Sequence, residues 1–383
     1  MRILYHHRTR SRDGQRVHIE GLVAALVRLG HEVAVVGPAP EDDSPIRHQR
    51  TIKRWLLPLR EIGEILYNLI EGRRLSTAAR DHRPEALYSR HSLLCSVPAR
   101  FARRFRMPWV VEVNAPLAQE REAHGGLFFR RWARRRENRT LNAADRVIVV
   151  TAVMKAMLVK QGVEASRIEI HRNGIDRDRW DPAFDVAALR REYSLQGSSV
   201  LGFVGFVREW NRLEMLFPFL QRTPNAMLLI VGDGPDVPRL RAMAGTCGIQ
   251  PQLRFTGAVK YEEVARFVAM FDVAIVPETP RYSSPLKLLD YLAQGCAILA
   301  PDRENLREIL AHDRSALLFD PDDRQDLEAQ LDRLLRDQKL RKRLGQEARA
   351  TLDRLELTWE HNARRVVGIF QDLAKARKPR GQG

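Results

Sequence analysis

The stretch that begins at Ser284 combines side chains that are able to bind an anion. The apolar run at 272–276 predicts a buried parallel strand, and Ser284 and Pro285 are residue types that favour the start of a helix. A helix that begins just after such a strand points free backbone N–H groups and its positive dipole end at a ligand, which suits a phosphate best. Lys287 adds a cation in the first turn, and Asp290, one turn later, is able to accept from a pair of ribose hydroxyls. The alternative is a capped surface helix on which Lys287 and Asp290 form a solvated pair.

The elements around this stretch repeat a strand–helix pattern. Gly295 is expected to end the helix, and apolar strand candidates separated by helical stretches lie at 199–205, 227–231, 253–256, 272–276, 296–300 and 316–319. The first half begins with a strand at 3–5, a helix at 16–29 and a strand at 32–36, followed by strands at 109–113, 146–150 and 168–170. Alternation of this kind predicts a doubly wound parallel sheet.

Length and composition limit the class of protein. The 383 residues, 44% of them hydrophobic, are enough for two α/β domains. We expect an N-terminal domain at 1–178, an interdomain connection at 179–198, a C-terminal domain at 199–355, and a segment at 356–383 whose helix crosses back to the N-terminal domain.

The sequence also favours a cytoplasmic protein. It contains no apolar run of about 18 residues that would predict a membrane span, and a strand at the very N-terminus leaves no room for a signal peptide. Three cysteines without metal-ligand spacing indicate buried thiols in a reducing compartment, so no metal site is expected.

The positive charge is concentrated in the first half. Residues 1–180 hold 34 Lys and Arg against 20 Asp and Glu, a balance of +14, whereas residues 181–383 hold 30 against 28, a balance of +2. Arginines alternate with aromatic or aliphatic residues at 51–80, 100–106 and 128–136, a pattern typical of helices on an acidic lipid surface. We therefore expect an anionic membrane partner for the first domain, at the inner face of the plasma membrane. A merely basic surface is the alternative, and the absence of any RNA-recognition motif argues against nucleic acid.

Two polar residues follow the expected fourth strand of the first domain. Glu112 and Asn114 share one face of that strand. An amide cannot act as a base at neutral pH, but Glu112 is able to do so if burial raises its pKa. A structural partner for one of the many arginines is the reading that we favour slightly for Glu112. Gly14, between the first strand and helix, either lets a phosphate approach or simply makes the turn, and no G-x-G-x-x-G pattern accompanies it.

A set of short motifs, in a shared order and spacing, resembles the family 4 glycosyltransferases of the two-domain GT-B fold. The similarity covers most of the chain and is strongest from Asn173 to Phe319. The motifs are the Arg/Gly-rich first loop, Glu112-Val-Asn-Ala-Pro116, Asn173-Gly-Ile-Asp176, Gly202-Phe-Val-Gly205, Leu229-Ile-Val-Gly-Asp-Gly-Pro235, Phe255-Thr-Gly-Ala-Val259, Pro277, Ser284–Gly295 and Thr358-Trp359.

The resemblance implies two Rossmann-like domains facing a central cleft, and transfer of a sugar with retention and without a metal or other cofactor. It implies a UDP- or GDP-linked sugar donor bound mainly by the C-terminal domain and a saccharide or lipid-linked acceptor bound mainly by the N-terminal domain, in bacterial surface polysaccharide or glycolipid assembly. The donor residues that it implies are Gly14, Gly205, Val259, Ser284, Pro285, Leu286, Lys287 and Asp290. The catalytic residues are Glu112, Asn114, Lys287 and Arg208, and the acceptor residues are Arg90 and Asn114.

The sequence departs from the family pattern at several positions. Asp290 stands for the second Glu of the family's E-x7-E pattern, and Tyr282 stands where the first Glu is expected. Phe206 and Asn211 replace the Arg and Lys that follow Gly-x-x-Gly, so Arg208 is expected to supply the missing cation. These departures leave two alternatives open: a GT-B sugar-nucleotide epimerase, or a degenerate scaffold without catalysis.

Overall fold

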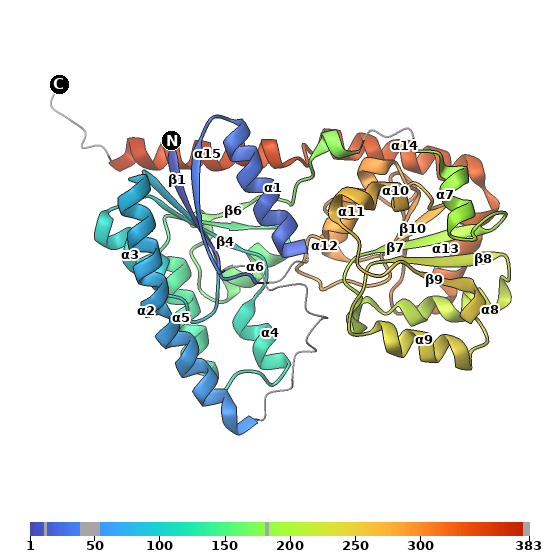
Figure 1. The fold of residues 1–383 in the computed structure, drawn as a ribbon, viewed down its shortest axis with the longest axis horizontal. Coiled ribbons are helices and arrows are strands. Elements are labelled where there is room, and N and C mark those ends of the chain that lie inside the picture. The colour runs from blue at the N-terminus through green and yellow to red at the C-terminus, as the bar shows by residue number, and fades with distance from the viewer. Residues whose placement is uncertain (11–13, 39–53, 181–183, 378–383) are drawn as a thin grey trace. The chain divides into compact units, whose positions relative to one another are not determined.

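The computed structural model describes residues 1–10, 14–38, 54–180 and 184–377. The chain forms two compact units, each with its own sheet: unit 1 comprises Met1–Arg172 and Trp359–Gly383, and unit 2 comprises Asn173–Thr358 (Figure 1). The chain therefore leaves unit 1 after Arg172 and returns to it at Trp359. Among the described helices, none is both long enough and apolar enough to cross a bilayer.

Unit 1 is built on a six-stranded parallel sheet with the order β2-β1-β3-β4-β5-β6. Its strands are β1 (Arg2–His6), β2 (Glu32–Val36), β3 (Ala86–Arg90), β4 (Trp109–Val113), β5 (Arg146–Val149) and β6 (Ile168–Ile170). The α-helices are α1 (Gly14–Arg28), α2 (Leu57–His82), α3 (Val97–Phe105), α4 (Leu117–Ala123), α5 (Arg130–Asn142), α6 (Ala152–Lys160) and α15 (Trp359–Arg377), with short 3-10 turns at Arg54–Leu56 and Ala165–Arg167. Strands β3 and β4 are buried along their whole length and are apolar except at their carboxyl ends, where Ser89, Arg90 and Glu112 lie.

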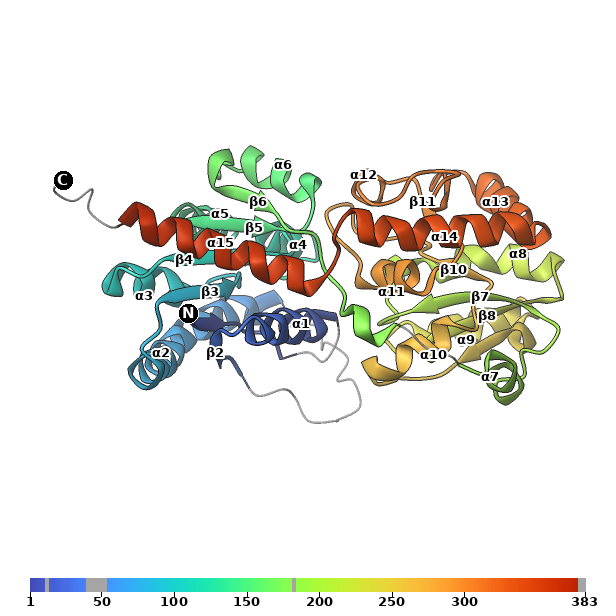
Figure 2. The same cartoon turned by 90° about the horizontal axis from the view of Figure 1, so that it is seen from above.

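The C-terminal helix α15 is part of unit 1 and packs against α1, as Figures 1 and 2 show. A Cβ on Gly21 of α1 would lie 2.4 Å from Nε1 of Trp359, so the missing side chain makes room for the indole. At its N-terminal half, α15 is fastened to the end of β6, where Asn362 Nδ2 donates to the carbonyl of Arg172 at 2.7 Å.

Unit 2 has a second six-stranded parallel sheet with the order β12-β11-β10-β7-β8-β9. Its strands are β7 (Ser199–Val204), β8 (Ala226–Val231), β9 (Leu253–Phe255), β10 (Val273–Ile275), β11 (Ile298–Pro301) and β12 (Leu317–Phe319). The α-helices are α7 (Val186–Glu192), α8 (Phe217–Arg222), α9 (Val237–Thr246), α10 (Val264–Val268), α11 (Leu286–Gln294), α12 (Glu304–Arg307), α13 (Arg324–Arg336) and α14 (Gln338–Arg354). Short 3-10 turns lie at Arg177–Arg179, Glu209–Asn211, Leu213–Leu216, Gln250–Gln252 and Tyr261–Glu263.

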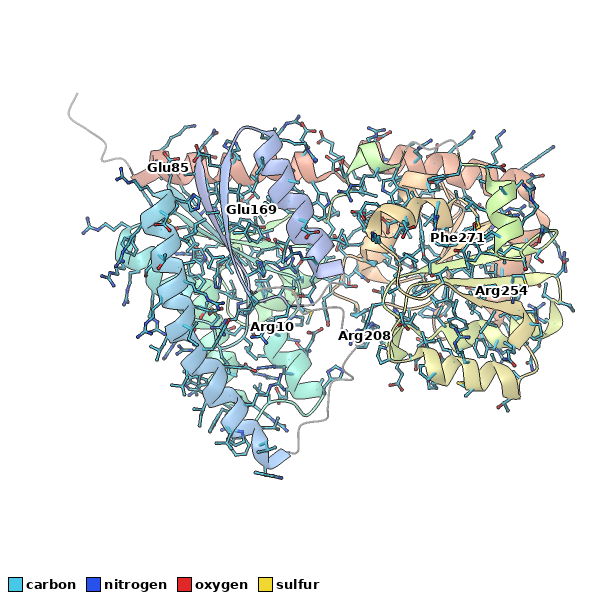
Figure 3. All side chains as sticks on the ribbon, in the orientation of Figure 1. Arg10, Glu85, Glu169, Arg208, Arg254 and Phe271 are labelled. Carbon is cyan, nitrogen blue, oxygen red and sulfur yellow. The ribbon has the colours of Figure 1, made fainter. Side chains whose placement is uncertain are left out.

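Both faces of this second sheet are covered by a hydrophobic core. Side chains of α10, α11 and α14 cover one face, and those of α8, α9 and α13 cover the other. Phe271, labelled in Figure 3, lies where a Cβ on Gly202 would be only 2.1 Å from its ring, so β7 needs glycine there. The fold class is therefore as predicted: two doubly wound parallel sheets.

The strand order of unit 2 changes direction between β7 and β10. The chain proceeds outward from β7 through β8 to β9 and then crosses back to β10. In open α/β sheets, ligands bind at such a point, outside the carboxyl ends of the two strands. The loop after β7 and the turn from β10 into α11 lie at this end of the sheet.

Some details differ from the sequence-based expectations. The described residues of the 179–198 segment belong to unit 2, and Trp180 and Leu195 are buried in its core. The start of α11 was predicted with Ser284 as N-cap and Pro285 as first helical residue; instead Pro285 is the N-cap and the helix begins at Leu286. The reason is that Pro285 has ψ 123°, so the backbone is still extended there. Gly295 ends the helix with φ 71°, as predicted.

Candidate functional site

The turn between β10 and α11 leaves a helix start without a side-chain cap. No side chain among the described residues accepts from the first amides of α11. Ser284, one residue before the N-cap, is buried, and its Oγ has no hydrogen-bond partner in the described part of the chain. Its carbonyl accepts from Asn173 Nδ2 at 2.7 Å, which holds the turn in place. Buried hydroxyls nearly always have a partner, so this group is suited to an incoming acceptor atom such as a phosphate oxygen.

Lys287 projects from the first turn of α11 over the end of β7. Its Nζ lies 3.6 Å from the centre of the Phe203 ring, and a Cβ on Gly205 would come within 3.4 Å of it. Gly205, with φ 132°, therefore provides both the space for the ammonium and a turn that other residues rarely adopt. Burial lowers the pKa of Lys287 to about 7, although the attraction of the Asp290 carboxylate acts in the opposite direction. A bound anion would reverse that effect.

Asp290 lies one turn further along α11 and is only 3% exposed. Tyr261 donates its hydroxyl to Asp290 Oδ1 at 3.2 Å. Burial raises the pKa of Asp290 to about 7, although Tyr261 and the Lys287 charge act in the opposite direction. Asp290 thus remains under-compensated, and its carboxylate is suited to accept from ligand hydroxyls. The contribution of Tyr261 was missed, because no motif links it to a position almost thirty residues later in the chain.

Arg208 lies on the loop after β7 (Figure 3). Its guanidinium carbon lies 4.6 Å from the centre of the Phe206 ring and 4.8 Å from that of Trp210, so two aromatic rings fix its direction. The amide of Val207 donates to the carbonyl of Asp233 at 2.9 Å, which joins this loop to the turn after β8. Asp233 accordingly shapes a turn, and its own Oδ1 accepts from the amide of Gly234 at 2.8 Å.

The other donor-side candidates are placed less directly. Val259 follows β9 and packs against the core of unit 2. Glu278 is the carboxylate that precedes Tyr282, the position where the family's first Glu is expected. It forms an ion pair with Arg303 at 2.6 Å. Gly14 is the first residue of α1, whereas Arg12 in the preceding loop lies outside the described residues.

In unit 1, Glu112 is the centre of a polar network at the carboxyl end of β4. We call this network closed because both oxygens of the Glu112 carboxylate have partners. The carboxylate is 1% exposed and accepts from the Tyr88 hydroxyl at 2.5 Å and from Asn114 Nδ2. His18 Nε2 lies 2.9 Å from its Oε1, and Arg90 Nη1 lies 3.6 Å from the same atom. The contact between Glu112 and Asn114 confirms that the two side chains share a face.

The pKa of Glu112 bears on the catalytic base that the sequence left open. Burial alone would raise it, but the neighbouring His18 and Arg90 and the donated hydrogen bonds hold the pKa of Glu112 well below its usual range. A carboxylate in this state is a poor proton acceptor near neutral pH. The pKa is therefore not raised as a base requires, and the contact with Arg90 agrees with the structural partner that the sequence slightly favoured. His18, on α1, was not identified from the sequence.

The structure brings the predicted residues together in two groups. Ser284, Pro285, Leu286, Lys287, Asp290 and Gly205 meet at the switch point of unit 2. Arg90, Glu112 and Asn114 meet at the carboxyl ends of β3 and β4 in unit 1.

Comparisons with known proteins agree with the resemblance. Residues 12–179 match the family Glycosyltransferase Family 4, and residues 187–351 match Glycosyl transferases group 1. A relative in Mycolicibacterium smegmatis (strain ATCC 700084 / mc(2)155), named GDP-mannose-dependent alpha-mannosyltransferase, is 27% identical over 369 residues, which is 93% of this chain and 92% of the relative.

Solved structures give the same fold. A sucrose-phosphate synthase from Thermosynechococcus elongatus superposes with a TM-score of 0.77 at 17% identity, over 98% of this chain and 100% of that one. Anabaena Alr3699/HepE, solved in complex with UDP and glucose, gives a TM-score of 0.72 at 16% identity, over 98% and 99% of the two chains. The GT-B fold expected from the sequence is confirmed.

Proposed function

Since this chain belongs to the retaining glycosyltransferases of family 4, we propose that unit 2 binds the nucleotide-sugar donor at the turn from β10 into α11. The proposal rests on three features that lie together at this turn. The Ser284 hydroxyl is buried without a partner among the described residues, the start of α11 has no side-chain cap, and the attraction of Asp290 does not offset the effect of burial on the pKa of Lys287. The diphosphate of a donor would accept from the Ser284 hydroxyl and the first amides of α11, and its charge would pair with the Lys287 ammonium.

The same groups are suited to the chemical step. As the bond between the anomeric carbon and the diphosphate breaks, negative charge grows on the leaving phosphate oxygen. The amides of α11, Ser284 and Lys287 are already oriented to stabilise that charge, and loss of one such donor typically costs ~3 kcal/mol. We propose that Arg208, fixed between Phe206 and Trp210, adds a second cation.

The acceptor hydroxyl then attacks from the face that the leaving group occupied, and the departing phosphate oxygen takes its proton. This route needs no protein base, which agrees with the low pKa of Glu112. We propose that Glu112 orients Asn114 and Arg90, and that these two contact the acceptor.

For the nucleoside, we propose that Asp290 accepts from the ribose hydroxyls, with Tyr261 fixing the carboxylate. We propose further that the backbone at Val259 meets the base, and that Gly14 of unit 1 approaches the diphosphate. One relative is named for GDP-mannose, and one structural neighbour was solved with UDP, so both nucleotides are candidates.

Calorimetry with UDP and GDP tests the donor site directly. We expect wild-type protein to bind one of them, and Lys287→Ala to weaken that binding on the order of 100-fold, the equivalent of ~3 kcal/mol. Lys339→Ala, which removes an exposed lysine of α14 in the same unit, is the matched control and should leave binding unchanged. Affinity and turnover of Lys287→Ala within about twofold of wild type would reject the phosphate role of Lys287.

We also propose that unit 1 binds an anionic lipid surface through α2, so that the acceptor is lipid-linked and the enzyme works at the inner face of the plasma membrane. Leu59, Ile62, Leu66, Leu69 and Ile70 are all exposed and recur at helical spacing along one side of α2. Leu66 and Leu69 are 58% and 67% exposed, far more than a helix packed only on its own sheet requires.

The charges beside this apolar side complement acidic headgroups. Arg60, Arg73 and Arg74 are exposed on the same helix, and residues 1–180 carry a balance of +14. Basic residues near such a surface contribute about 1 kcal/mol each. The exposed side of α2 thus combines apolar area with positive charge, as interfacial helices do.

Vesicle sedimentation tests the lipid surface. Wild-type protein should sediment with anionic vesicles and remain in solution with neutral ones, and the double variant Leu66→Asp, Leu69→Asp should lose the binding. Val27→Asp, at an exposed valine of α1, is the control that should keep it. Equal binding to anionic and neutral vesicles would reject the proposal.

A further inference from the structure

Unit 1 contains a cluster of three metal-ligating side chains that the glycosyl transfer does not use. His6 ends β1, Glu71 lies on α2, and Cys95 lies between β3 and α3, and all three are buried. One ligand atom from each residue lies within 4.8 Å of the other two. His6 Nε2 is 3.5 Å from Glu71 Oε1, and Cys95 Sγ is 3.6 Å from Glu71 Oε2. Sequence spacing did not reveal this cluster because its members are more than twenty residues apart.

His6 lacks the contacts that a buried imidazole normally has. It is 1% exposed, and its Nδ1 has no hydrogen-bond partner among the described residues. The approach of Nε2 to Glu71 is too long for a good hydrogen bond. A buried polar ring without partners is costly, and a bond to a metal ion would satisfy it.

We propose that His6, Glu71 and Cys95 bind a divalent transition-metal ion of the Zn²⁺ type. An imidazole nitrogen, a carboxylate oxygen and a thiolate sulfur are ligands that Zn²⁺ accepts in tetrahedral sites, with water completing the fourth position. The thiolate excludes Mg²⁺ and Ca²⁺, which prefer oxygen ligands.

Binding requires the Cys95 thiol to lose its proton. The sulfur–metal bond forms as the S–H bond breaks, and the proton is released to solvent, so that no oxidant or reductant is needed. Burial raises the pKa of Cys95 to about 12, and the thiol therefore stays protonated until an ion arrives. The negative charges of Glu71 and of the new thiolate match the two charges of the ion.

Arg8 competes with the ion for Glu71. Its Nε donates to Glu71 Oε2 at 2.7 Å, and its Nη2 donates to Asn68 Oδ1 at 3.2 Å. In the metal-free protein this guanidinium neutralises Glu71. With the ion bound, β1, α2 and the segment before α3 are joined through one centre, which would brace α2 against the sheet.

Cobalt titration of the full-length protein tests the site without reference to activity. We expect Co²⁺ to give a near-ultraviolet thiolate-to-metal absorption band that saturates at one ion per chain and is displaced by Zn²⁺. Cys95→Ser should abolish the band, whereas Cys247→Ser, at a half-buried thiol of unit 2, should retain it. Arg8→Gln should lower the Co²⁺ concentration needed for half-saturation severalfold, because it removes the competing cation.

The absence of a saturable band in wild-type protein, or a band that persists in Cys95→Ser, would overturn the proposal. Should Cys95→Ser fail to fold, His6→Gln serves instead, since it removes the imidazole ligand and leaves the thiol. A full band in His6→Gln would likewise contradict a three-ligand site. Because the signal arises in unit 1 and needs no nucleotide, failure of this site is distinguishable from failure of the donor site.

Discussion

The two units hold buried charges in opposite ways. In unit 1, Glu112 has a partner for each of its oxygens, and its pKa is held well below the usual range. In unit 2, the half-buried Lys287 and the buried Asp290 have few partners, and their pKa values both move to about 7. Both groups lie at the carboxyl end of a parallel sheet, so position alone does not separate them. The number of partners around the charged group does.

The contrast suggests different roles for the two groups. A closed network such as that of Glu112 contributes to the fold, because removing one member leaves the others buried and unpaired. A charged group with few partners, such as Lys287 or Asp290, we call open. Such a group costs stability in the free protein and is retained when a ligand compensates its charge. Substitutions should therefore affect mainly stability in the first case and mainly ligand binding in the second.

The largest effect is expected from Glu112→Gln. The substitution removes the anion that compensates Arg90 and His18, and breaking a buried charge pair typically costs 3–5 kcal/mol, so we expect a loss of about 3 kcal/mol or more in the free energy of unfolding. Urea unfolding measures it. A variant with unchanged stability and a severalfold lower kcat would instead favour a direct catalytic role for Glu112.

Lys287→Met should have the converse effect. Nucleotide affinity is expected to fall on the order of 100-fold, whereas the melting temperature at pH 7 should rise by a few degrees, since a desolvated charge that Asp290 compensates only in part is removed. The folded-state pKa of Lys287 lies below that of the unfolded chain, so its charge opposes folding fully below about pH 7 and progressively less as the pH rises. The thermal gain should accordingly shrink toward alkaline pH. A melting temperature that falls at pH 7 would show that Lys287 belongs to a closed network as well.

The sequence predicted the fold more completely than the site. Alternating apolar and helical stretches indicated both parallel sheets, and Gly295 was identified as the end of α11, because strand burial and the left-handed conformation leave local signals. Lys287 and Asp290 were found for the same reason: they lie on one short helix after a recognisable strand.

Residues that act across the sequence left no such signal. Tyr261 reaches Asp290, and His18 reaches Glu112, only through the packing of separate elements. The direction of the Glu112 pKa stayed open in the sequence, because the partners that compensate its charge come from separate elements. Ser284 was expected to cap α11, whereas the extended conformation of Pro285 moved it outside the helix.

A change in pH is expected to have a smaller effect on nucleotide affinity. The diphosphate binds the protonated form of Lys287, so nucleotide affinity should fall as the pH rises through about 7, by up to about tenfold per unit. Asp290 gives the opposite dependence below that pH, because its ionised form accepts from the ribose. Calorimetry across this range should show the alkaline decline in wild type and not in Lys287→Arg, whose guanidinium stays charged. An identical decline in both would assign it to another group.

The smallest effect is expected from Tyr261→Phe. It removes one hydrogen bond to Asp290 and leaves the ring in place, so nucleotide affinity should fall about fivefold, the equivalent of ~1 kcal/mol. Tyr193→Phe, at a tyrosine whose ring packs edge-on against Phe267 in the same unit, is the control and should leave affinity unchanged. Because Asp290 belongs to the open group, the melting temperature should change little in Tyr261→Phe. A loss of several degrees with unaltered affinity would mean that the Tyr261–Asp290 pair resembles the closed network of unit 1, and that the ribose is held elsewhere.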